Sequence, residues 1–294
     1  IGNGRIIPSG PMRENLSQAI NRSHLAIIID QDIRNIKALI LAAGLGTRLK
    51  PLTDIWPKCL MPICNRPLLD YWLTILNNCG INNVLVNTHY LSAHVEDFIN
   101  QTQFKNWVES IYEPELLGTA GTIRENIDYC SNTTLLLAHG DNWTCCNFSD
   151  FLNFHLNHRP ENTVMTMMTF NCFNPEACGI VEIDENGVVI DFHEKVNNPP
   201  GNSANAAVYL LEPEVIEWIN NNPSVNDFST DVIPNFKGKI ATWENSEIHR
   251  DIGTIESLRD AQKDIFKVSS LSENSLWQKN FLKNKIHRLI NENY

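Results

Sequence analysis

A glycine-rich loop holds the first side chains whose types and spacing could do chemistry. The apolar run from Ile36 to Ala43 has the pattern of a strand buried on both faces, as in a parallel sheet. Gly44 and Gly46 follow it, and glycine lets backbone N–H groups approach a phosphate because no Cβ stands in the way. Arg48 adds a planar fork of donors that suits phosphate oxygens. The loop therefore predicts a polyphosphate site.

A second positive charge, Lys58, follows on a segment stiffened by Pro57. Two familiar phosphate-binding loops do not fit this stretch. A dinucleotide-binding fingerprint needs a third glycine where Leu49 stands. A P-loop needs Lys after its last glycine, but Gly46 is followed by Thr47.

The stretch instead resembles the signature G-x-G-T-R-x-x-P-x-T-x-x-x-P-K-x-L-x-P of the sugar-1-phosphate nucleotidyltransferase family. Every position of that signature is present: Gly44, Gly46, Thr47, Arg48, Pro51, Thr53, Pro57, Lys58, Leu60 and Pro62. A pattern of this length rarely arises by chance. The resemblance covers residues 36–262 and implies transfer of a nucleoside monophosphate from a nucleoside triphosphate (NTP) to a sugar 1-phosphate, with release of pyrophosphate.

The resemblance also assigns roles to residues of two loops. Arg48 would hold the β- and γ-phosphates, and Lys58 would neutralise charge that develops around the α-phosphate. A second loop, residues 113–122, carries two glycines before a helix and would lie against the base, although a simple capped loop would also explain it. The nucleotide-binding residues implied are Leu41, Ala42, Ala43, Gly44, Gly46, Thr47, Glu115, Gly118 and Thr119.

Two aspartates far apart in the sequence are candidate metal ligands. Asp141 follows the apolar run Leu135–His139 and is preceded by Gly140, where a carboxylate can either cap a turn or hold a hard cation such as Mg²⁺. Asp251, with Gly253 close behind, resembles the second metal-binding aspartate of the family. The resemblance therefore implies Mg²⁺ as cofactor, held by Asp141 and Asp251.

A predicted hairpin over residues 179–194 ends in the charged pair Glu194-Lys195, which could also be an ordinary exposed pair. In the family such a pair contacts the sugar hydroxyls and the sugar phosphate. The sugar-phosphate-binding residues implied are Gly179, Glu194, Lys195 and Asn205. The sequence departs from the family at Ala207, where glycine is usual, and the extra methyl group could narrow the sugar pocket.

The substrates together bring roughly five to six negative charges at neutral pH. The acceptor phosphate is already ionised, so catalysis is expected to consist of positioning and electrostatic stabilisation, without a covalent intermediate. The run Leu-Gly-Thr-Ala-Gly at 117–121 resembles the guanylyltransferase branch, which favours GTP with mannose 1-phosphate or a manno-heptose 1-phosphate. UTP or dTTP with a glucose- or muramate-type sugar phosphate is the alternative. A non-catalytic regulatory protein that binds a nucleotide sugar, and a scaffold that acts through its termini, are alternatives from other classes.

The elements that must position these residues alternate between strand and helix. Apolar runs predict strands, and helical spacing predicts helices, in the order 36–43, 67–78, 84–87, 93–101 and 111–112. This β-α-β-α-β order predicts a doubly wound α/β sheet, with ligands beyond the carboxyl ends of its strands. The resemblance makes it a Rossmann-like mixed sheet of GT-A type.

Two segments flank this domain of residues 36–262. Residues 1–35 form an N-terminal extension, of which residues 2–14 resemble a short stretch of the lipid A 4′-kinase family but bring no P-loop. Residues 263–294 form a C-terminal extension, in which the spacing of apolar groups over 271–290 predicts one amphipathic helix. We expect that helix to dock on the body or on a second subunit, so a homo-oligomer is left open.

Composition limits the partners and the compartment. The 294 residues carry a net charge of −11, which argues against nucleic acid as a partner. No apolar run reaches the length that crosses a bilayer, so no membrane association is expected. The eight cysteines form no Cys-x-x-Cys pair and no signal-peptide pattern is present, which together predict reduced thiols and a cytoplasmic protein.

Overall fold

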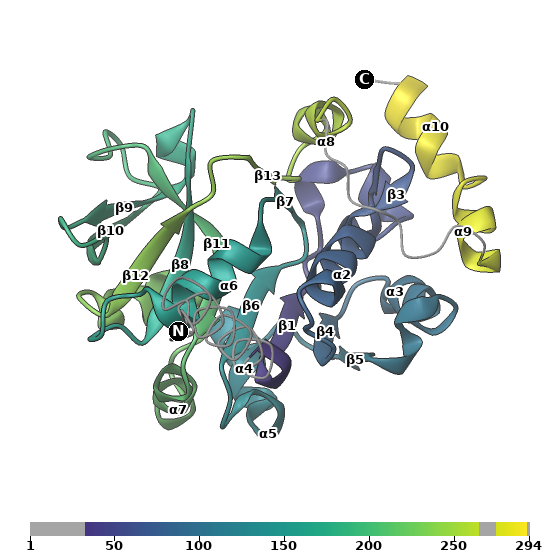
Figure 1. Cartoon of the computed structure of the whole chain (residues 1–294). Coiled ribbons are helices and arrows are strands. Elements are labelled where there is room, and N and C mark those ends of the chain that lie inside the picture. The colour runs from purple at the N-terminus through teal and green to yellow at the C-terminus, as the bar shows by residue number, and fades with distance from the viewer. Residues whose placement is uncertain (1–32, 265–274, 293–294) are drawn as a thin grey trace, which may run out of the picture.

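One mixed sheet runs through the middle of the computed structural model, which describes residues 33–264 and 275–292 (Figure 1). Within those residues the sheet has nine strands, in the order β10-β9-β11-β6-β1-β4-β5, with β8 paired to β11 and β12 paired to β8. The strands are β1 (Lys37–Leu41), β4 (Val84–Thr88), β5 (Val108–Tyr112), β6 (Leu135–His139), β8 (Met165–Asn171), β9 (Gly179–Ile183), β10 (Val189–Glu194), β11 (Ser203–Leu211) and β12 (Ile240–Glu244). The fold class expected from the sequence is confirmed.

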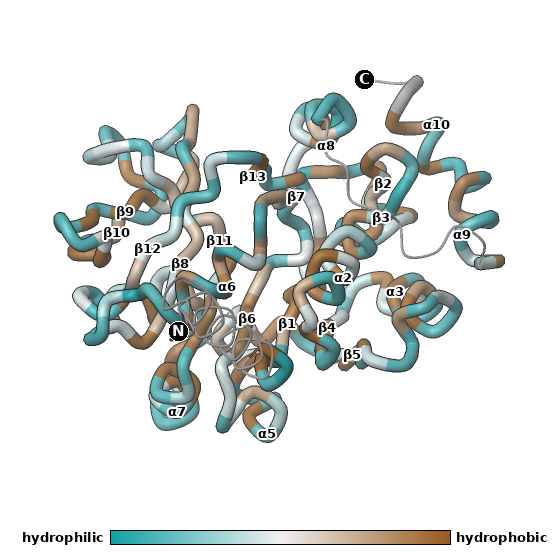
Figure 2. Tube along the Cα trace, in the orientation of Figure 1, coloured by the Kyte–Doolittle hydropathy of each residue, from teal (hydrophilic) through white to brown (hydrophobic). Residues whose placement is uncertain are grey.

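The half of the sheet that carries the glycine loop is parallel. Strand β1 pairs in parallel with β4 and with β6, and β4 pairs in parallel with β5. Both faces of β1 are buried, because Ala38 and Ile40 lie in one hydrophobic cluster while Leu39, between them, lies in a second. This burial on two sides is the reason the strand is an unbroken apolar run. Figure 2 shows the apolar colouring concentrated on these inner strands.

Helices cover both faces of the sheet. The helices of the described residues are α2 (Leu68–Asn78), α3 (Ser92–Asn100), α4 (Thr119–Glu125), α5 (Ile127–Cys130), α6 (Phe148–Asn157), α7 (Pro213–Asn221), α8 (Ile255–Ala261), α9 (Leu276–Phe281) and α10 (Lys285–Glu292). Apolar residues of α2, α3 and α6 join the cluster that includes Ile40, and those of α4 and α7 join the cluster that includes Leu39. Among the described residues, no helix is long and apolar enough to cross a membrane.

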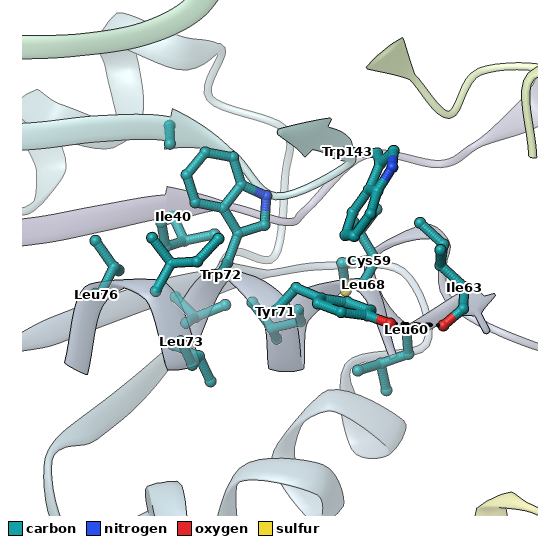
Figure 3. Close-up of a cluster of buried hydrophobic side chains, with 14 of the residues drawn as sticks. Ile40, Cys59, Leu60, Ile63, Leu68, Tyr71, Trp72, Leu73, Leu76 and Trp143 are labelled. Atoms are coloured by element: carbon teal, nitrogen blue, oxygen red, sulfur yellow. Dashed lines mark hydrogen bonds between the residues drawn. The ribbon is translucent and has the colours of Figure 1, made fainter. Parts of the chain in front are cut away.

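Helix α2 ties the segment after the glycine loop to the rest of the core (Figure 3). The Tyr71 hydroxyl donates to the Ile63 carbonyl at 3.0 Å, and its ring meets Trp143 edge-on with centroids 4.6 Å apart. The Trp72 indole donates to the Asn142 carbonyl at 2.8 Å. The helix therefore fixes the chain just beyond Lys58 and the chain just beyond Asp141 in one unit.

Two small antiparallel sheets complete the fold. Strands β2 (Pro62–Ile63) and β3 (Arg66–Pro67) form one, directly after the Lys58 segment. Strands β7 (Asn142–Cys145) and β13 (Ile248–Asp251) form the other, in which Asp251 is paired with Asn142. The second pairing brings the end of the domain back to the carboxyl end of β6.

The two extensions differ in what the structure describes. Residues 1–32, including the stretch that resembles lipid A 4′-kinases, lie outside the described residues. In the C-terminal extension, the single helix expected over 271–290 is instead two helices, α9 and α10, and residues 271–274 lie outside the described part. The apolar side chains of both helices, Trp277, Phe281, Ile286 and Ile290, are buried in the same cluster as Ile40. The expectation that this segment docks on the body is confirmed.

Candidate active site

Lys58 lies at the centre of a cluster of two cations and two carboxylates. It begins a 3₁₀ turn, Lys58–Leu60, and its side chain is only 9% exposed. Its ammonium group donates to Asp141 Oδ2 at 2.5 Å and to Asp251 Oδ1 at 3.0 Å. The two candidate metal ligands therefore meet at one nitrogen, although they are far apart in sequence.

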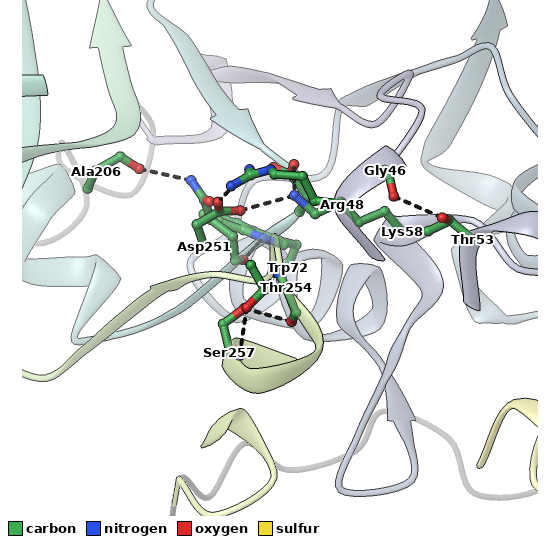
Figure 4. Close-up of polar contacts among 11 residues, drawn as sticks. Gly46, Arg48, Thr53, Lys58, Trp72, Ala206, Asp251, Thr254 and Ser257 are labelled. Carbon is green, nitrogen blue, oxygen red and sulfur yellow. Dashed lines mark hydrogen bonds and ion pairs between the residues drawn. The ribbon is translucent and has the colours of Figure 1, made fainter. Parts of the chain in front are cut away.

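Arg48 completes this cluster from the glycine loop (Figure 4). Its Nη2 donates to Asp251 Oδ2 at 3.0 Å, and its side chain is 66% exposed, so it borders open solvent. Gly253 makes the approach feasible, because a Cβ there would lie 2.6 Å from Arg48 Nη2 and 2.5 Å from Asp251 Oδ2. The glycine after the second aspartate is thus explained by crowding around the Arg48–Asp251 pair.

Backbone pairing brings the two aspartates together. Asp251 ends β13 opposite Asn142, and the next amide, Ile252 N–H, donates to the Asp141 carbonyl at 3.2 Å. Gly140 packs so closely that a Cβ there would lie 2.8 Å from Ile40 Cγ2. Asp141 is therefore held at the carboxyl end of the parallel strands, where ligands of such sheets bind.

The glycine loop is shaped by its own contacts. Gly46 has a φ of 62°, and its carbonyl accepts a hydrogen bond from the Thr53 hydroxyl at 2.8 Å. A Cβ on Gly46 would lie 2.7 Å from Thr53 Cγ2, so conformation and space both require glycine. Gly44 and Thr47 are exposed. The loop leaves these two residues open to an incoming ligand beside Arg48.

A cavity of about 240 Å³ opens next to the cluster. Its lining residues are Leu41, Ala43, Gly44, Asn87, Glu113, Leu116, Gly118, Thr119, Thr122, His139 and Asp141. Five of the nine residues expected to bind the nucleotide are among them, and Asp141 joins the cavity to the charged cluster. Ala42 lies beside this cavity, and its N–H donates to Asn87 Oδ1 at 2.7 Å. Glu115 is exposed and is not part of the lining.

The buried polar floor of this cavity was not expected from the sequence. Glu113 is 3% exposed, and its Oε1 accepts hydrogen bonds from Thr122 Oγ1 at 2.7 Å and from Asn87 Nδ2 at 3.1 Å. Among the described residues, Glu113 Oε2 has no hydrogen-bond partner. The sequence did contain an indication of this position, because Glu113 directly follows β5 at the ligand-binding edge of the sheet. The sequence interpretation chose Glu115 in the same loop instead.

A second segment, residues 226–228, packs against Gly118 and Thr119. Gly118 has a φ of 77°, and a Cβ there would lie 2.5 Å from the Asn226 carbonyl oxygen. The Thr119 hydroxyl accepts from the Phe228 N–H at 2.6 Å, and Ala120 N–H donates to the Asn226 carbonyl at 2.9 Å. The loop expected to lie against the base is therefore pinned by residues more than a hundred positions later in the chain.

The four residues expected to bind the sugar phosphate lie at the ends of β9, β10 and β11. A Cβ on Gly179 would lie 2.6 Å from Glu194 Oε2, so glycine permits this carboxylate to lie across β9. Lys195 Nζ contacts Glu194 Oε1 at 2.8 Å. Asn205 Nδ2 donates to the Tyr209 hydroxyl at 2.7 Å. Within the described part of the chain, none of these four residues forms a hydrogen bond or ion pair with Lys58, but Asn142, next to Asp141, donates to the Ala206 carbonyl at 3.1 Å.

Electrostatics fix the charge of the central cluster. Burial lowers the pKa of Lys58, but the carboxylates of Asp141 and Asp251 more than offset this, so the pKa lies above its usual value. Burial likewise raises the pKa of Asp141, but the Lys58 ammonium holds it below its usual range. Burial lowers the pKa of the neighbouring His249 to about 4, against the attraction of both aspartates. At pH 7, Lys58 is therefore charged, Asp141 is ionised and His249 is neutral.

The donor set at this cluster fits a hard divalent cation. Asp141 and Asp251 offer carboxylate oxygens that both lie within 3.0 Å of Lys58 Nζ, and Asp141, with its side chain 30% exposed, lines the cavity. Among the described residues, one group of three candidate ligands lies elsewhere, Glu182, Asp191 and His193 on the β9–β10 hairpin. Its members pair with one another and with Lys237, and these ion pairs account for them without an ion.

Together, the mixed sheet and the charged cluster at its carboxyl edge define an α/β protein of the GT-A-like fold class. The sequence profile of the family described as "Nucleotidyl transferase" matches residues 37–268. The chain belongs to that family.

Individual relatives agree with this assignment. The chain is 30% identical to a mannose-1-phosphate guanylyltransferase of Mycobacterium tuberculosis over 79% of its own length and 65% of the relative. It is 33% identical to the catalytic subunit beta of that enzyme from Drosophila melanogaster, over 64% of this chain and 51% of the relative. It is 28% identical to a UTP–glucose-1-phosphate uridylyltransferase of Synechocystis, over 63% and 51%. The chain thus spans about half to two thirds of these curated relatives.

A solved structure shares the fold. A Bacillus anthracis protein, named as a candidate glucose-1-phosphate thymidylyltransferase and crystallised with sucrose, superposes with a TM-score of 0.71. The match covers 80% of this chain and 98% of the other, at 23% identity. At that identity the likeness extends to the fold alone.

Proposed function

We propose that this protein transfers a nucleoside monophosphate from an NTP to a sugar 1-phosphate and releases pyrophosphate. The observation that carries the proposal is the convergence of Arg48 and Lys58 with Asp141 and Asp251 beside a cavity of nucleotide-binding character. Two cations and two carboxylates at one solvent-accessible edge suit a reaction whose substrates are polyanions. A protein that only bound a nucleotide sugar would not need this set intact.

Each residue of the cluster has a role that follows from its place. Arg48, exposed at the rim, would bind the outer phosphates through its planar fork of donors. Lys58, buried deeper, would donate to the oxygens on which charge develops during transfer. Asp141 and Asp251 would hold Mg²⁺, which would supply charge neutralisation at the phosphates. Lys195, beside Glu194, would orient the acceptor phosphate.

We further propose GTP as the nucleotide, because of Glu113. Guanine presents two adjacent donors, N1–H and the 2-amino group, on the edge that pairs with other bases. Glu113 Oε1 is already occupied by Thr122 and Asn87, so Oε2 remains to accept from such an edge. Uracil and thymine offer one donor flanked by two carbonyl oxygens, which a carboxylate repels. Two of the three curated relatives described above are named as mannose-1-phosphate guanylyltransferases, and a mannose or manno-heptose 1-phosphate is the proposed acceptor.

UTP or dTTP with a glucose- or muramate-type sugar phosphate is the second candidate, since one of the relatives is a uridylyltransferase. A pyrophosphate-release assay that crosses GTP, UTP, dTTP, ATP and CTP with a panel of sugar 1-phosphates separates the two. We expect turnover with GTP and a manno-configured sugar phosphate, dependent on Mg²⁺. Turnover with UTP or dTTP alone would support the second candidate. Nucleotide-sugar binding without any pyrophosphate release would refute catalysis and support a regulatory role.

A further inference from the structure

We infer that the C-terminal helices α9 and α10 are a working part of the active site, because they position the turn that carries Lys58. These helices lie beyond residue 268, where the family match ends, and beyond residue 262, where the sequence placed the end of the catalytic domain. The inference rests on the proposed function only in naming Lys58 as catalytic. The geometry that supports it does not depend on the substrate.

The first link is Trp56, which stands two residues before Lys58. Its indole Nε1 donates to the Leu60 carbonyl at 2.8 Å, and its own N–H donates to the Leu52 carbonyl at 3.2 Å. The first hydrogen bond spans the Lys58 turn, with one partner on each side of the lysine. Trp56 therefore determines where the base of the Lys58 side chain lies, and its own ring is only 7% exposed.

The second link is the aromatic packing that buries this indole. The ring of Phe281, on α9, stacks on Trp56 with centroids 5.9 Å apart and an interplanar angle of 29°. Trp277, one turn earlier on α9, lies 6.4 Å from Trp56 and 5.1 Å from Phe281. The ring centroid of His94, on α3, lies 4.8 Å from the ring centroid of Trp56. The side chains of α9 thus supply much of the apolar surface that holds the indole in place.

The third link anchors α9 and α10 to the body, so that they act as a fixed support. Trp277 meets Phe98 of α3 edge-on, with centroids 4.8 Å apart, and Figure 1 shows α9 next to α3. Ile286 and Ile290 of α10 are 0% and 5% exposed, and α10 contacts the 3₁₀ turn Leu52–Asp54. This turn and the Lys58 turn belong to one stretch of chain. The C-terminal helices therefore contact that stretch at the Leu52–Asp54 turn and at Trp56, two residues before Lys58.

Packing by α9 affects where the Lys58 ammonium group lies, and not only how stable the fold is. Lys58 must keep its ammonium within hydrogen-bond reach of a developing charge, and a misplacement of about 1 Å can cost about 10²-fold in rate. The 3₁₀ turn that carries it is short and has only local backbone hydrogen bonds, Leu60 N–H to Pro57 and Met61 N–H to Lys58. We therefore assign Trp56 and Phe281 as positioning residues for Lys58.

The test compares Phe281→Leu with Phe236→Leu. Phe236 is a matched control, since it is a buried aromatic residue of the other hydrophobic cluster, packed on Trp218. We expect Phe281→Leu to lower kcat about tenfold or more, with KM for the nucleotide changed less than about threefold. Phe236→Leu should lower Tm by a similar amount and leave kcat within about twofold. Trp56→Phe, which keeps a ring but loses the donor to Leu60, should lower kcat in the same way.

A second readout does not depend on activity. Hydrogen exchange at the amides of Leu60 and Met61 should accelerate in Phe281→Leu and stay unchanged in Phe236→Leu. If neither exchange nor kcat changes in Phe281→Leu, or if kcat falls and exchange accelerates in both variants in proportion to the loss in Tm, the inference is overturned. If the wild-type protein releases no pyrophosphate with any substrate, the proposed function fails, and the exchange data alone decide the positioning role.

Discussion

Lys58 Nζ lies 2.5 Å from Asp141 Oδ2, and this contact joins a lysine after the glycine loop to an aspartate 83 positions later. The pair is informative because each partner is mostly shielded from water, with 9% and 30% of the side chain exposed. Burial disfavours both charges, and each partner shifts the pKa of the other toward the charged form. Under the proposed function, this buried cation and carboxylate beside the cavity would bind an anionic ligand and a metal ion.

Lys58→Ala should lower kcat by about 10²- to 10³-fold, because it removes one donor to the developing charge. The fold should be retained, since Arg48 still pairs with Asp251 and the Asp141 carboxylate reaches solvent. Lys50→Ala is the matched control, because Lys50 is exposed in the same segment and pairs only with exposed Asp54. Pyrophosphate release and a thermal melt measure both effects. Near wild-type turnover in Lys58→Ala would remove its catalytic assignment.

Asp141→Asn and Asp251→Asn should each weaken Mn²⁺ binding about tenfold or more in the presence of GTP, because a neutral amide replaces a carboxylate ligand. Mn²⁺ stands in for Mg²⁺ here, so that bound ion can be counted by electron paramagnetic resonance without any turnover. Asp54→Asn removes a carboxylate outside the cluster and should leave Mn²⁺ affinity unchanged. Unchanged affinity in both cluster variants would show that the metal is held elsewhere.

Glu113→Gln should shift the base preference from guanine toward uracil. The Gln oxygen can still accept from Thr122 and Asn87, which places the new amide group where Oε2 stood. An amide donor there opposes the donors of guanine and matches a carbonyl oxygen of uracil. A change of one hydrogen bond by about 1–3 kcal/mol predicts a fall of about tenfold or more in the ratio of kcat/KM for GTP to that for UTP. Glu115→Gln, on an exposed side chain of the same loop, should leave that ratio unchanged.

Local patterns were sufficient to predict the framework of the site from the sequence. The run 36–43 predicted β1, and the residues after it predicted the glycine loop with Arg48 and Lys58 beyond the carboxyl ends of the strands. These features depend on neighbours in sequence, such as the apolar run and the glycines. The hairpin over 179–194 was predictable for the same reason, and the structure forms it as β9 and β10.

Long-range packing set the parts that the sequence could not show. Asp141 lies near Asp251 because β13 pairs with β7, and the residues of neither strand indicate which strand it pairs with. The expected helix over 271–290 is split into α9 and α10, with Trp277 and Phe281 packed on Trp56. An amphipathic pattern shows that a face is buried but not which surface buries it.

The free energy of unfolding should fall as pH drops below about 6.5, because of the network of His155, Arg159 and Glu212 next to α7. The side chains of His155 and Arg159 both contact Glu212 Oε1 at 2.8 Å, and these hydrogen bonds lower the pKa of Glu212 to about 2. Between pH 4.5 and 2 the unfolded chain therefore binds more protons at this site, so stability is lost as pH falls. Burial also lowers the pKa of His155 below 6.5, so loss of stability begins there, as the unfolded histidine protonates first.

Glu212→Gln tests this network. The variant should melt at a lower temperature at pH 7, and its Tm should change less than that of the wild type between pH 5 and pH 3. Glu214→Gln is the control, because Glu214 lies two residues later, in the first turn of α7, but is 53% exposed and pairs with exposed Lys239. Thermal melts across the pH range measure the slopes. Parallel curves for Glu212→Gln and the wild type would contradict the assignment.

Ala207→Gly tests whether the Ala207 methyl group contributes to sugar selection, apart from the effect of its positive φ on stability. Ala207 has a φ of 52° in the irregular stretch between Asn205 and Tyr209, and its N–H donates to Asn205 Oδ1 at 2.9 Å. A left-handed backbone costs an L-residue about 1–2 kcal/mol, and glycine relieves this but costs about 0.5–1 kcal/mol in unfolded-state entropy. The net gain in stability should therefore lie between about 0 and 1.5 kcal/mol.

Since the substitution should not destabilise the fold, a change in acceptor preference can be assigned to the missing methyl group. We expect Ala207→Gly to accept bulkier sugar 1-phosphates, with a rise in their kcat/KM relative to the preferred acceptor. Ala204→Gly, on a buried residue of the same strand without a positive φ, should instead lower Tm and leave the preference unchanged. If the acceptor profile of Ala207→Gly matches the wild type, the methyl group does not face the sugar. The conformation of Ala207 then matters only for holding Asn205 in place.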